Sequence, residues 1–280
     1  MKKLLFIILA VAASNQLFAQ VSEGGMPRSF QTTALKSKAV IATYSLPALD
    51  TVSLLNYDNK TSTPFRYGVV KKVSIDLKNA GTKISLPDGG TLWKYKISSP
   101  NDKSIALILG SFIVPKGAEL YLYNDDYTVV RGAYTNLNMR SDMSFTIGDF
   151  PGNYVILEYY EPVNPEFEGN LVINGISEAY INILDKKSIN TDGDGFIGVN
   201  CEEGKEWQEQ KHAVLKYSFT SGLYSYLCSG ALINNSKNDG TPYFLTANHC
   251  LSSAADAASV VAYFNYENPA CLSTYPDSYQ

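Results

Sequence analysis

The feature that most constrains this chain is a long series of short stretches in which apolar and polar residues alternate. In residues 92–97, a tryptophan, a tyrosine and an isoleucine at every second position are separated by lysines, so one face of an extended strand would be buried and the other solvated. Similar stretches occupy residues 69–75, 105–113, 119–123, 143–147, 154–160, 171–176 and 179–183. Turn-forming residues such as Asp88-Gly89-Gly90 and Pro151-Gly152-Asn153 lie between them. About eight such strands fit two packed sheets, so we expect a mostly β protein with an antiparallel β-sandwich over residues 46–184.

The composition supports strands and argues against one class of partner. Twenty tyrosines and 12 phenylalanines outnumber 4 methionines and 2 tryptophans, and aromatic residues favour strands over helices. The formal net charge is −4 at pH 7, which does not attract a polyanion. We therefore expect no nucleic-acid partner.

The first 19 residues have the layout of a secretory signal peptide. Lys2 and Lys3 precede an apolar run over residues 4–13, and a polar stretch then ends in Ala19, after which we expect cleavage. An apolar run of this length is short of the roughly 20 residues of a membrane-spanning helix, so a permanent anchor is the weaker reading. Residues 20–45 follow as a polar leader segment. We expect an exported protein with no membrane attachment once the signal is removed, in an extracellular or periplasmic compartment where disulfides persist.

A change of character near residues 184–200 marks a domain boundary. Polar and glycine-rich sequence interrupts the strand pattern there, so we place a linker at residues 185–197 and a second domain at residues 198–280. All four cysteines follow this point. Because the chain has no C-x-x-C pair and only two histidines, we expect no zinc site and no other cofactor.

The linker contains an incomplete match to a calcium-binding loop. Asn190, Asp192, Asp194 and Gly195 occupy positions 1, 3, 5 and 6 of an EF-hand loop, but position 12 is Cys201 instead of glutamate. Because the match fails at its strongest ligand, a solvated linker is the favoured interpretation, with an incidental calcium site as the alternative.

The segment most informative about chemistry ends in a histidine next to a cysteine. Residues 243–246 read as an apolar strand that runs into Ala247-Asn248-His249-Cys250, and residues 228–234 read as its partner strand. A disulfide between Cys228 and Cys250 would hold the histidine-bearing loop in place. Such a restraint suits a general base, which must stay within hydrogen-bond reach of its nucleophile.

These residues resemble a known family of enzymes. Residues 246–250, preceded by residues 228–233, resemble the catalytic-histidine region of trypsin-like serine proteases. More narrowly, residues 199–204, 239–247 and 262–271 are similar, in the same order, to the secreted bacterial lysyl endopeptidases. The resemblance covers about residues 198–271, and residues 46–184 resemble, more loosely, the β-rich pro-region of such proteases. It implies a partial trypsin-like barrel over residues 198–280, protein or peptide substrates, and an intramolecular contact with the pro-domain.

The resemblance implies that His249 is the general base of a Ser-His-Asp triad. In proteases of this chain order the aspartate follows the histidine by about 45 residues and the serine by about 140, so residues 250–280 are too few to contain either. Asp256 and Asp277 lie too near His249 in sequence to match, and Ser229 belongs to a strand motif, not to a nucleophile elbow. We therefore expect a precursor cut short after the catalytic-histidine region and inactive as written.

The resemblance also fixes expectations for other residues. Four cysteines allow three pairings, of which we expect Cys228 with Cys250 and Cys201 with Cys271. His212 lacks the flanking motif and is expected on the surface. Removal of the first domain is expected to cut the chain between residues 184 and 200, where Lys186 and Lys187 offer the bonds.

Aromatic residues of the first domain admit two interpretations. They could line a carbohydrate groove, but aromatics at alternate positions of a strand are more often core residues, which is what we expect. The residues concerned are Trp93, Tyr121, Tyr123, Tyr159 and Tyr160.

Two functions from different classes follow from the sequence. The leading hypothesis is a secreted serine endopeptidase zymogen, with cleavage after lysine indicated only by the family. The alternative is a non-catalytic, exported β-sandwich binding or adhesion protein whose protease-like tail is degenerate.

Overall fold

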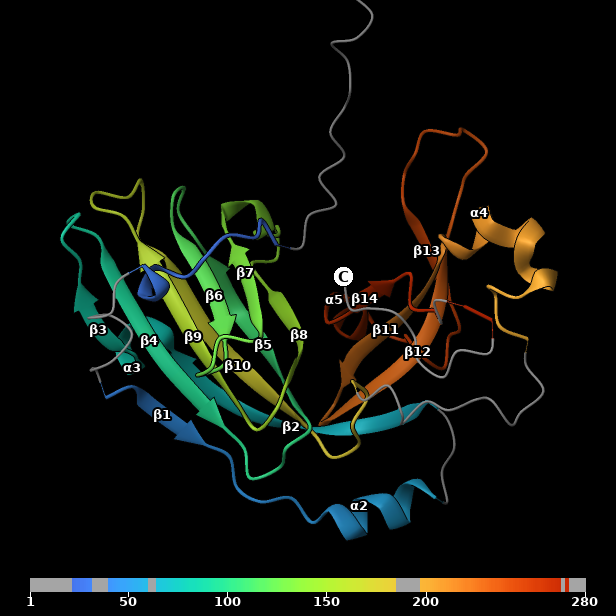
Figure 1. The fold of residues 1–280 in the computed structure, drawn as a ribbon, viewed down its shortest axis with the longest axis horizontal. Coiled ribbons are helices and arrows are strands. Elements are labelled where there is room, and N and C mark those ends of the chain that lie inside the picture. The colour runs from blue at the N-terminus through green and yellow to red at the C-terminus, as the bar shows by residue number, and fades with distance from the viewer. Residues whose placement is uncertain (1–21, 32–39, 60–63, 185–196, 268–269, 272–280) are drawn as a thin grey trace, which may run out of the picture.

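The structure is a computed structural model that describes residues 22–31, 40–59, 64–184, 197–267 and 270–271 (Figure 1). The expected signal peptide, the calcium-loop candidates before residue 197, Lys186, Lys187 and Asp277 lie outside the described residues. The described part is mostly β, as the alternating sequence pattern predicts. None of its helices has the length and apolarity that crossing a bilayer requires.

All strands of the first sheet except β1 come from residues of the expected sandwich. Its strands run in the order β1-β4-β9-β6-β7, and β3 pairs with β4. The bounds are β1 (Ala42–Ser45), β3 (Thr82–Ser85), β4 (Thr91–Ser98), β6 (Glu119–Tyr123), β7 (Val130–Tyr134) and β9 (Tyr154–Glu161). Strand β1 pairs with β4 in parallel, with Ala42 opposite Tyr95. Strand β1 lies just before residues 46–184, for which the antiparallel sandwich is expected, so this parallel pair adds to that sandwich from outside it.

The second sheet contains strands from both sides of the expected linker. The order is β14-β11-β12-β2-β10-β5-β8, with β13 paired to β12. The bounds are β2 (Phe65–Asp76), β5 (Ser104–Ile113), β8 (Phe145–Pro151), β10 (Asn170–Ala179), β11 (Val214–Ser221), β12 (Tyr224–Ile233), β13 (Tyr243–Thr246) and β14 (Val261–Phe264). Figure 1 shows β2 extending from the sandwich to the β11 and β12 side of the molecule.

Short helices connect the strands. They are η2 (Arg28–Phe30), α2 (Thr51–Asp58), α3 (Leu77–Ala80), η3 (Asn136–Asn138), η4 (Glu202–Trp207), α4 (Gln208–Lys211) and α5 (Ala254–Ala258).

Three expected strands differ from those observed. The expected strands at 171–176 and 179–183 are instead one strand, β10, which ends at Ala179. The chain then bends because the backbone N–H groups of Tyr180 and Ile181 both donate to the carbonyl oxygen of Tyr67, at 2.9 and 3.2 Å. Strand β8 begins at Phe145 and not at residue 143, since Met143 has a left-handed φ of 58° that a strand does not accommodate.

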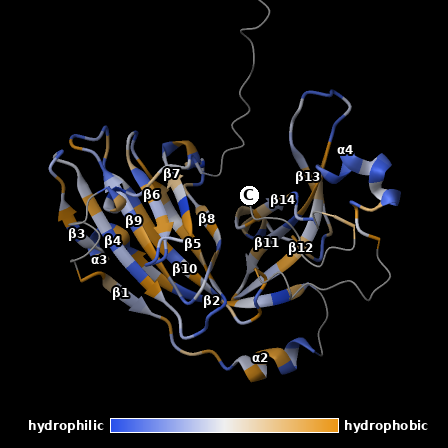
Figure 2. Cartoon of the chain, in the orientation of Figure 1, coloured by the Kyte–Doolittle hydropathy of each residue, from blue (hydrophilic) through white to orange (hydrophobic). Residues whose placement is uncertain are grey.

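The main core lies between the two sheets of the sandwich. Trp93 and Tyr159 stack there with ring centroids 5.7 Å apart, and Figure 2 shows hydrophobic residues recurring along these strands. The aromatic residues that were weighed as a carbohydrate groove are all buried, with 0 to 6% of their surface exposed. Burial is therefore confirmed for all five, with Trp93 and Tyr159 in this core and Tyr121 and Tyr123 in a separate cluster on the other face of the sheet.

The second sheet closes on itself almost completely. Its end strands, β14 and β8, pack against each other at Gly148, where a Cβ atom would lie 2.8 Å from the Tyr263 hydroxyl and 2.9 Å from a methyl of Val261. Only a residue without a side chain permits this approach. A second contact links the segments that precede β8 and β14. The Arg140 guanidinium donates a hydrogen bond to the carbonyl oxygen of Ala258 at 2.9 Å.

Arg66 holds helix α2 against the junction of β2 and β12. Its guanidinium pairs with Asp58 at 2.7 Å and lies 4.5 Å from the ring centre of Tyr57 on the same helix. On the strand side it lies 4.3 Å from the ring centre of Tyr224. A charge that is paired and stacked in this way can be buried without a large desolvation cost.

A buried carboxylate lies where β8 meets β2 and β5. Asp149 is fully buried, and its two oxygens accept hydrogen bonds from the Tyr67 hydroxyl at 2.8 Å and the Ser104 hydroxyl at 2.9 Å. Burial raises the pKa of Asp149, although these hydrogen bonds and the charge of Arg131 act in the opposite direction. The ionised form is therefore disfavoured in the folded protein.

Asp149 generates a pH-dependent prediction. Because its folded pKa is raised above the ordinary value of 3.8, its contribution to stability is fully present below that value and is lost as the pH rises through the folded pKa. Asp149→Asn does not titrate, so the stability of the wild type relative to this variant should rise as the pH falls from 7 to about 4. Urea unfolding of both proteins across this range measures the difference. A difference independent of pH would contradict the burial argument.

Candidate functional site

His249 lies in a turn directly after strand β13. Strand β13 pairs with β12 in a register that places Thr246 opposite Gly230 and Tyr243 opposite Ile233. The turn is closed by a hydrogen bond from the Cys250 N–H to the Ala247 carbonyl oxygen at 3.0 Å. The sheet edge thus sets where the histidine leaves the strand.

A disulfide holds this turn to the neighbouring strand. Cys250 is bonded to Cys228 of β12, with their Cα atoms 6.3 Å apart, and Cys250 is buried. His249 is therefore adjacent in sequence to a residue that is covalently fixed to the sheet. This is the same cysteine pair that the resemblance implies.

Thr246 fixes the end of β13 by hydrogen bonds. Its hydroxyl donates to the Ser229 carbonyl oxygen at 2.9 Å and lies 2.8 Å from the Tyr217 hydroxyl. Tyr217 is fully buried in β11, and burial raises the pKa of its phenol. The turn that carries His249 is thus linked through Thr246 to two neighbouring strands.

A small hydrophobic cluster supports the same turn. Tyr217 packs edge-on against Phe244 with ring centroids 5.2 Å apart. The cluster is formed by Leu215, Tyr217, Phe219 and Cys250, with Tyr226, Cys228, Leu232, Phe244, Leu251 and Val260 packed against it. It is separate from the core between the two sheets of the sandwich.

The His249 side chain is exposed. A ring nitrogen lies within 4.8 Å of the sulfur atoms of Cys228 and Cys250. Because both sulfurs are consumed in the disulfide, they are not thiolates and this group of three does not form a metal site. No hydrogen bond joins the histidine ring to another residue within the described ranges.

Within the described ranges, no carboxylate or hydroxyl group is hydrogen-bonded to His249. Asp256 is buried in α5, where its N–H donates to the Ser253 hydroxyl at 3.1 Å, and no hydrogen bond joins it to the histidine. Ser229 is exposed on β12 and acts through its carbonyl oxygen, which accepts the Thr246 hydrogen bond. His212 is exposed elsewhere, with Nδ1 3.0 Å from Asn265 Oδ1.

A cavity that the sequence did not reveal lies between the η4–α4 segment and the residues that follow β14. Cys201 is bonded to Cys271, and beside this bond the Lys211 ammonium contacts Asn200 Oδ1 at 2.9 Å and Glu267 Oε1 at 3.0 Å. The cavity has a volume of 270 Å³. It is lined by Val199, Trp207, Gln210, Lys211, Val214, Asn265, Tyr266 and Glu267. Its residues come from separate segments, which sequence spacing does not connect.

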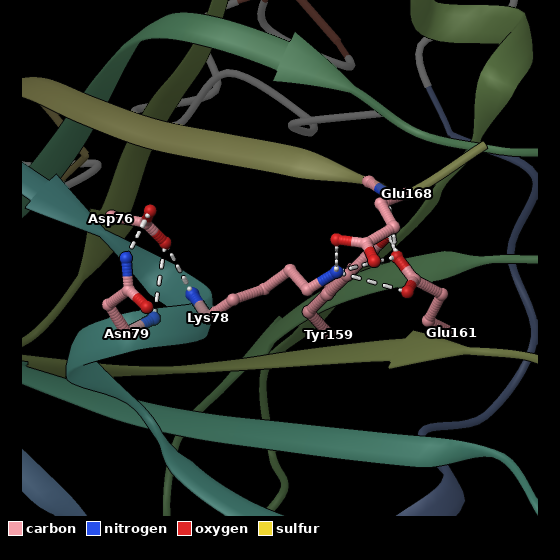
Figure 3. Close-up of polar contacts among 7 residues, drawn as sticks. Asp76, Lys78, Asn79, Tyr159, Glu161 and Glu168 are labelled. Carbon is pink, nitrogen blue, oxygen red and sulfur yellow. Dashed lines mark hydrogen bonds and ion pairs between the residues drawn. The ribbon is translucent and has the colours of Figure 1, made fainter.

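A polar cluster at one end of the sandwich has a structural explanation (Figure 3). The Lys78 ammonium pairs with Glu161 Oε1 at 3.1 Å and also reaches Glu168 at 3.8 Å. The other oxygen of Glu161 accepts hydrogen bonds at 2.8 Å from the Tyr159 hydroxyl and from the Gly169 N–H. The charge and both carboxylate oxygens of Glu161 are therefore paired within the protein. For this reason the cluster is not a candidate for catalysis.

Comparison with protein-family models gives a match over about the last third of the chain. Residues 189–280 match the family model described as lysyl endopeptidase, C-terminal domain. No solved structure matches the chain. The family match supports a lysyl endopeptidase-like protein and covers His249 together with all four cysteines.

The Cys228–Cys250 bond generates a prediction about the turn. Replacing both cysteines by alanine removes a cross-link spanning 22 residues, which lowers the free energy of unfolding by about 3 kcal/mol in the chain-entropy account. Limited chymotrypsin digestion should then cut faster at Tyr243 and Phe244. The matched control, Cys201→Ala with Cys271→Ala, should leave the rate of cutting at these two residues near that of the wild type. Equal acceleration in both variants would show that the turn is not held locally.

Proposed function

We propose that this protein is a secreted endopeptidase of the lysyl endopeptidase type, in which His249 is the general base and residues 46–184 form the pro-region. The observation that carries the proposal is the position of His249, next to a disulfide-bonded cysteine on the turn after β13, within the segment that matches the family. Cleavage after lysine is part of the proposal and rests on the family description.

The geometry around His249 suits a general base. The ring is exposed and so can reach a substrate, while the preceding strand and the following cysteine are held by hydrogen bonds and a covalent bond. In the proposed reaction His249 takes the proton from a serine hydroxyl and later gives it to the leaving amine. Holding the base in advance reduces the entropy lost in reaching the transition state.

The remaining groups of the triad must come from outside the described residues. A Ser-His-Asp catalyst requires a nucleophile and an orienting carboxylate. Neither Ser229 nor Asp256 is hydrogen-bonded to His249. The proposal therefore assigns only the histidine to this part of the chain and leaves the oxyanion donors unassigned.

Contacts between residues 46–184 and residues 198–280 support the assignment of the pro-region. Strand β12 pairs with β2, β14 packs against β8, and Arg140 bonds to Ala258. A pro-region that shares a sheet with the histidine-bearing strands is placed to assist their folding. The two disulfides fit an exported protein, because such bonds persist in oxidising compartments.

One observation favours a second candidate function. Because no carboxylate or serine hydroxyl among the described residues is bonded to His249, an exported binding or adhesion protein with a degenerate protease-like segment accounts for the same structure. The two functions differ in whether His249 is required for peptide-bond hydrolysis.

Comparison of the two histidines separates these functions. In protein secreted by the native organism, His249→Ala should lower hydrolysis of lysyl peptides by three or more orders of magnitude, as loss of a triad member does. His212→Ala, which removes the chain's other histidine, should leave the rate unchanged. Secreted, folded wild type without lysyl peptidase activity would favour the binding function.

A purified polypeptide limited to residues 20–280 tests whether this part of the chain holds a complete catalytic site by itself. Because the described residues bring no nucleophile to His249, the purified polypeptide should neither react with a fluorophosphonate probe nor hydrolyse lysyl peptides. Labelling of a serine, or turnover that His249→Ala abolishes, would show that the polypeptide already contains a complete site.

A further inference from the structure

Residues 22–31, called here the 22–31 segment, lie across the outer face of the first sheet, opposite the sandwich core (Figure 1). The segment joins the sheet at its edge strand, β7. The Glu23 N–H donates to the Ala133 carbonyl oxygen at 2.9 Å, and the Ala133 N–H donates to the Gly24 carbonyl oxygen at 2.9 Å. This is the backbone pairing by which an extended peptide adds to a sheet edge.

Ser29 occupies a fully buried position on this face. Its N–H donates to Glu158 Oε1 at 3.0 Å, and its hydroxyl lies 3.1 Å from the Tyr123 hydroxyl. Tyr123 in turn donates to Glu158 Oε2 at 2.7 Å. Glu158 is only 1% exposed, so the segment supplies one of the hydrogen bonds that this buried carboxylate requires.

The residue before Ser29 is recognised by charge and by an aromatic ring. The Arg28 guanidinium lies 4.0 Å from the ring centre of Tyr160. It also pairs with Glu119 at 3.6 Å and Asp88 at 3.9 Å. A cation stacked on a ring between two carboxylates is a selective contact for a basic side chain.

The residue after Ser29 is recognised by aromatic packing. Phe30 lies edge-on to Tyr127 and Tyr123, with ring centroids 4.1 and 5.2 Å apart. These tyrosines belong to a small cluster that is distinct from the main sandwich core. Three consecutive residues therefore fit three chemically different subsites on one sheet face.

We propose that the outer face of the first sheet is a peptide-binding groove, and that residues 22–31 are a peptide bound there in cis through the sequence Arg28-Ser29-Phe30. Edge pairing with β7 sets the direction of the peptide, and the subsites for a basic, a small and an aromatic residue set its sequence preference. A free peptide of the same sequence binds the groove when the segment is no longer covalently attached.

One consequence rests on the proposed lysyl endopeptidase function. The 22–31 segment contains no lysine, whereas Lys36 and Lys38 follow it. Cleavage after either lysine would separate the segment from the sandwich without cutting within it. The segment would then be retained by non-covalent contacts alone.

The test separates the segment from the rest of the folded protein with an added enzyme. A recognition sequence for a site-specific protease replaces residues 33–38, and the folded protein is cut there and passed through gel filtration. We expect the released peptide to co-elute with the protein, or to exchange with a fluorescein-labelled peptide of residues 22–31 that binds saturably. Because the cut does not depend on the protein's own activity, failure of the proposed peptidase function would not alter this result.

Variant peptides test the sequence preference in the same assay. The peptide carrying Arg28→Ala should bind at least tenfold more weakly, while Met26→Ala, at a residue that is 59% exposed, should bind like the parent peptide. Circular dichroism of the cut protein checks that the sheets persist. Loss of the peptide without saturable rebinding by a folded protein would overturn the proposal, as would equal binding of all three peptides. Unfolding on cutting would also overturn it, because the segment would then be part of the fold and not a ligand.

Discussion

The architecture depends on strand β2 being paired along both edges. Gly68 of β2 lies opposite Ala179 of β10 on one side and Ser225 of β12 on the other. Next to Gly68, the hydroxyl oxygens of Ser177 and Ser225 lie 2.6 Å apart, and both serines are buried. A Cβ atom on residue 68 would lie 3.0 Å from the Ser177 hydroxyl and 3.3 Å from the Ser225 Cβ. A glycine at this point is what allows three strands to share one tight contact.

This shared strand explains how the histidine-bearing turn is supported. Strand β12 carries Cys228, pairs with β13 and is itself paired to β2. The turn at His249 is thus connected to the sandwich by backbone hydrogen bonds as well as by its own disulfide. In the proposed function, a pro-region that provides a strand for this sheet would template the histidine side of the site.

Local sequence patterns predicted the strands better than their partners. Alternation of apolar and polar residues located β4, β5, β6 and β9 to within one or two residues, because burial of one face is encoded within each strand. The four-residue strands β1 and β3 were missed because they are too short to display a period. The parallel pairing of β1 and the pairing of β2 with β12 join segments distant in sequence, and such choices are made by tertiary packing.

The candidate site was predictable in its chemistry but not in its surroundings. The histidine, its neighbouring cysteine and the upstream cysteine are close enough in sequence to be recognised together. The contribution of Tyr217 through Thr246 depends on a contact between distant strands, as does the burial of the carboxylates Asp149 and Glu158 outside this site. An isolated acidic residue in an alternating strand has no sequence signal that distinguishes a buried position from a solvated one.

Hydrogen exchange at the junction tests most directly whether the sandwich and the histidine-bearing strands form one sheet. In the wild type, amides of residues 65–69 and 224–227 should exchange as slowly as those of β9 in the first sheet, because a junction that belongs to the second sheet opens only when the sandwich itself unfolds. In Gly68→Val, exchange at both junction segments should accelerate while β9 stays protected. Rapid exchange of residues 65–69 and 224–227 in the wild type, beside a protected β9, would contradict a shared sheet.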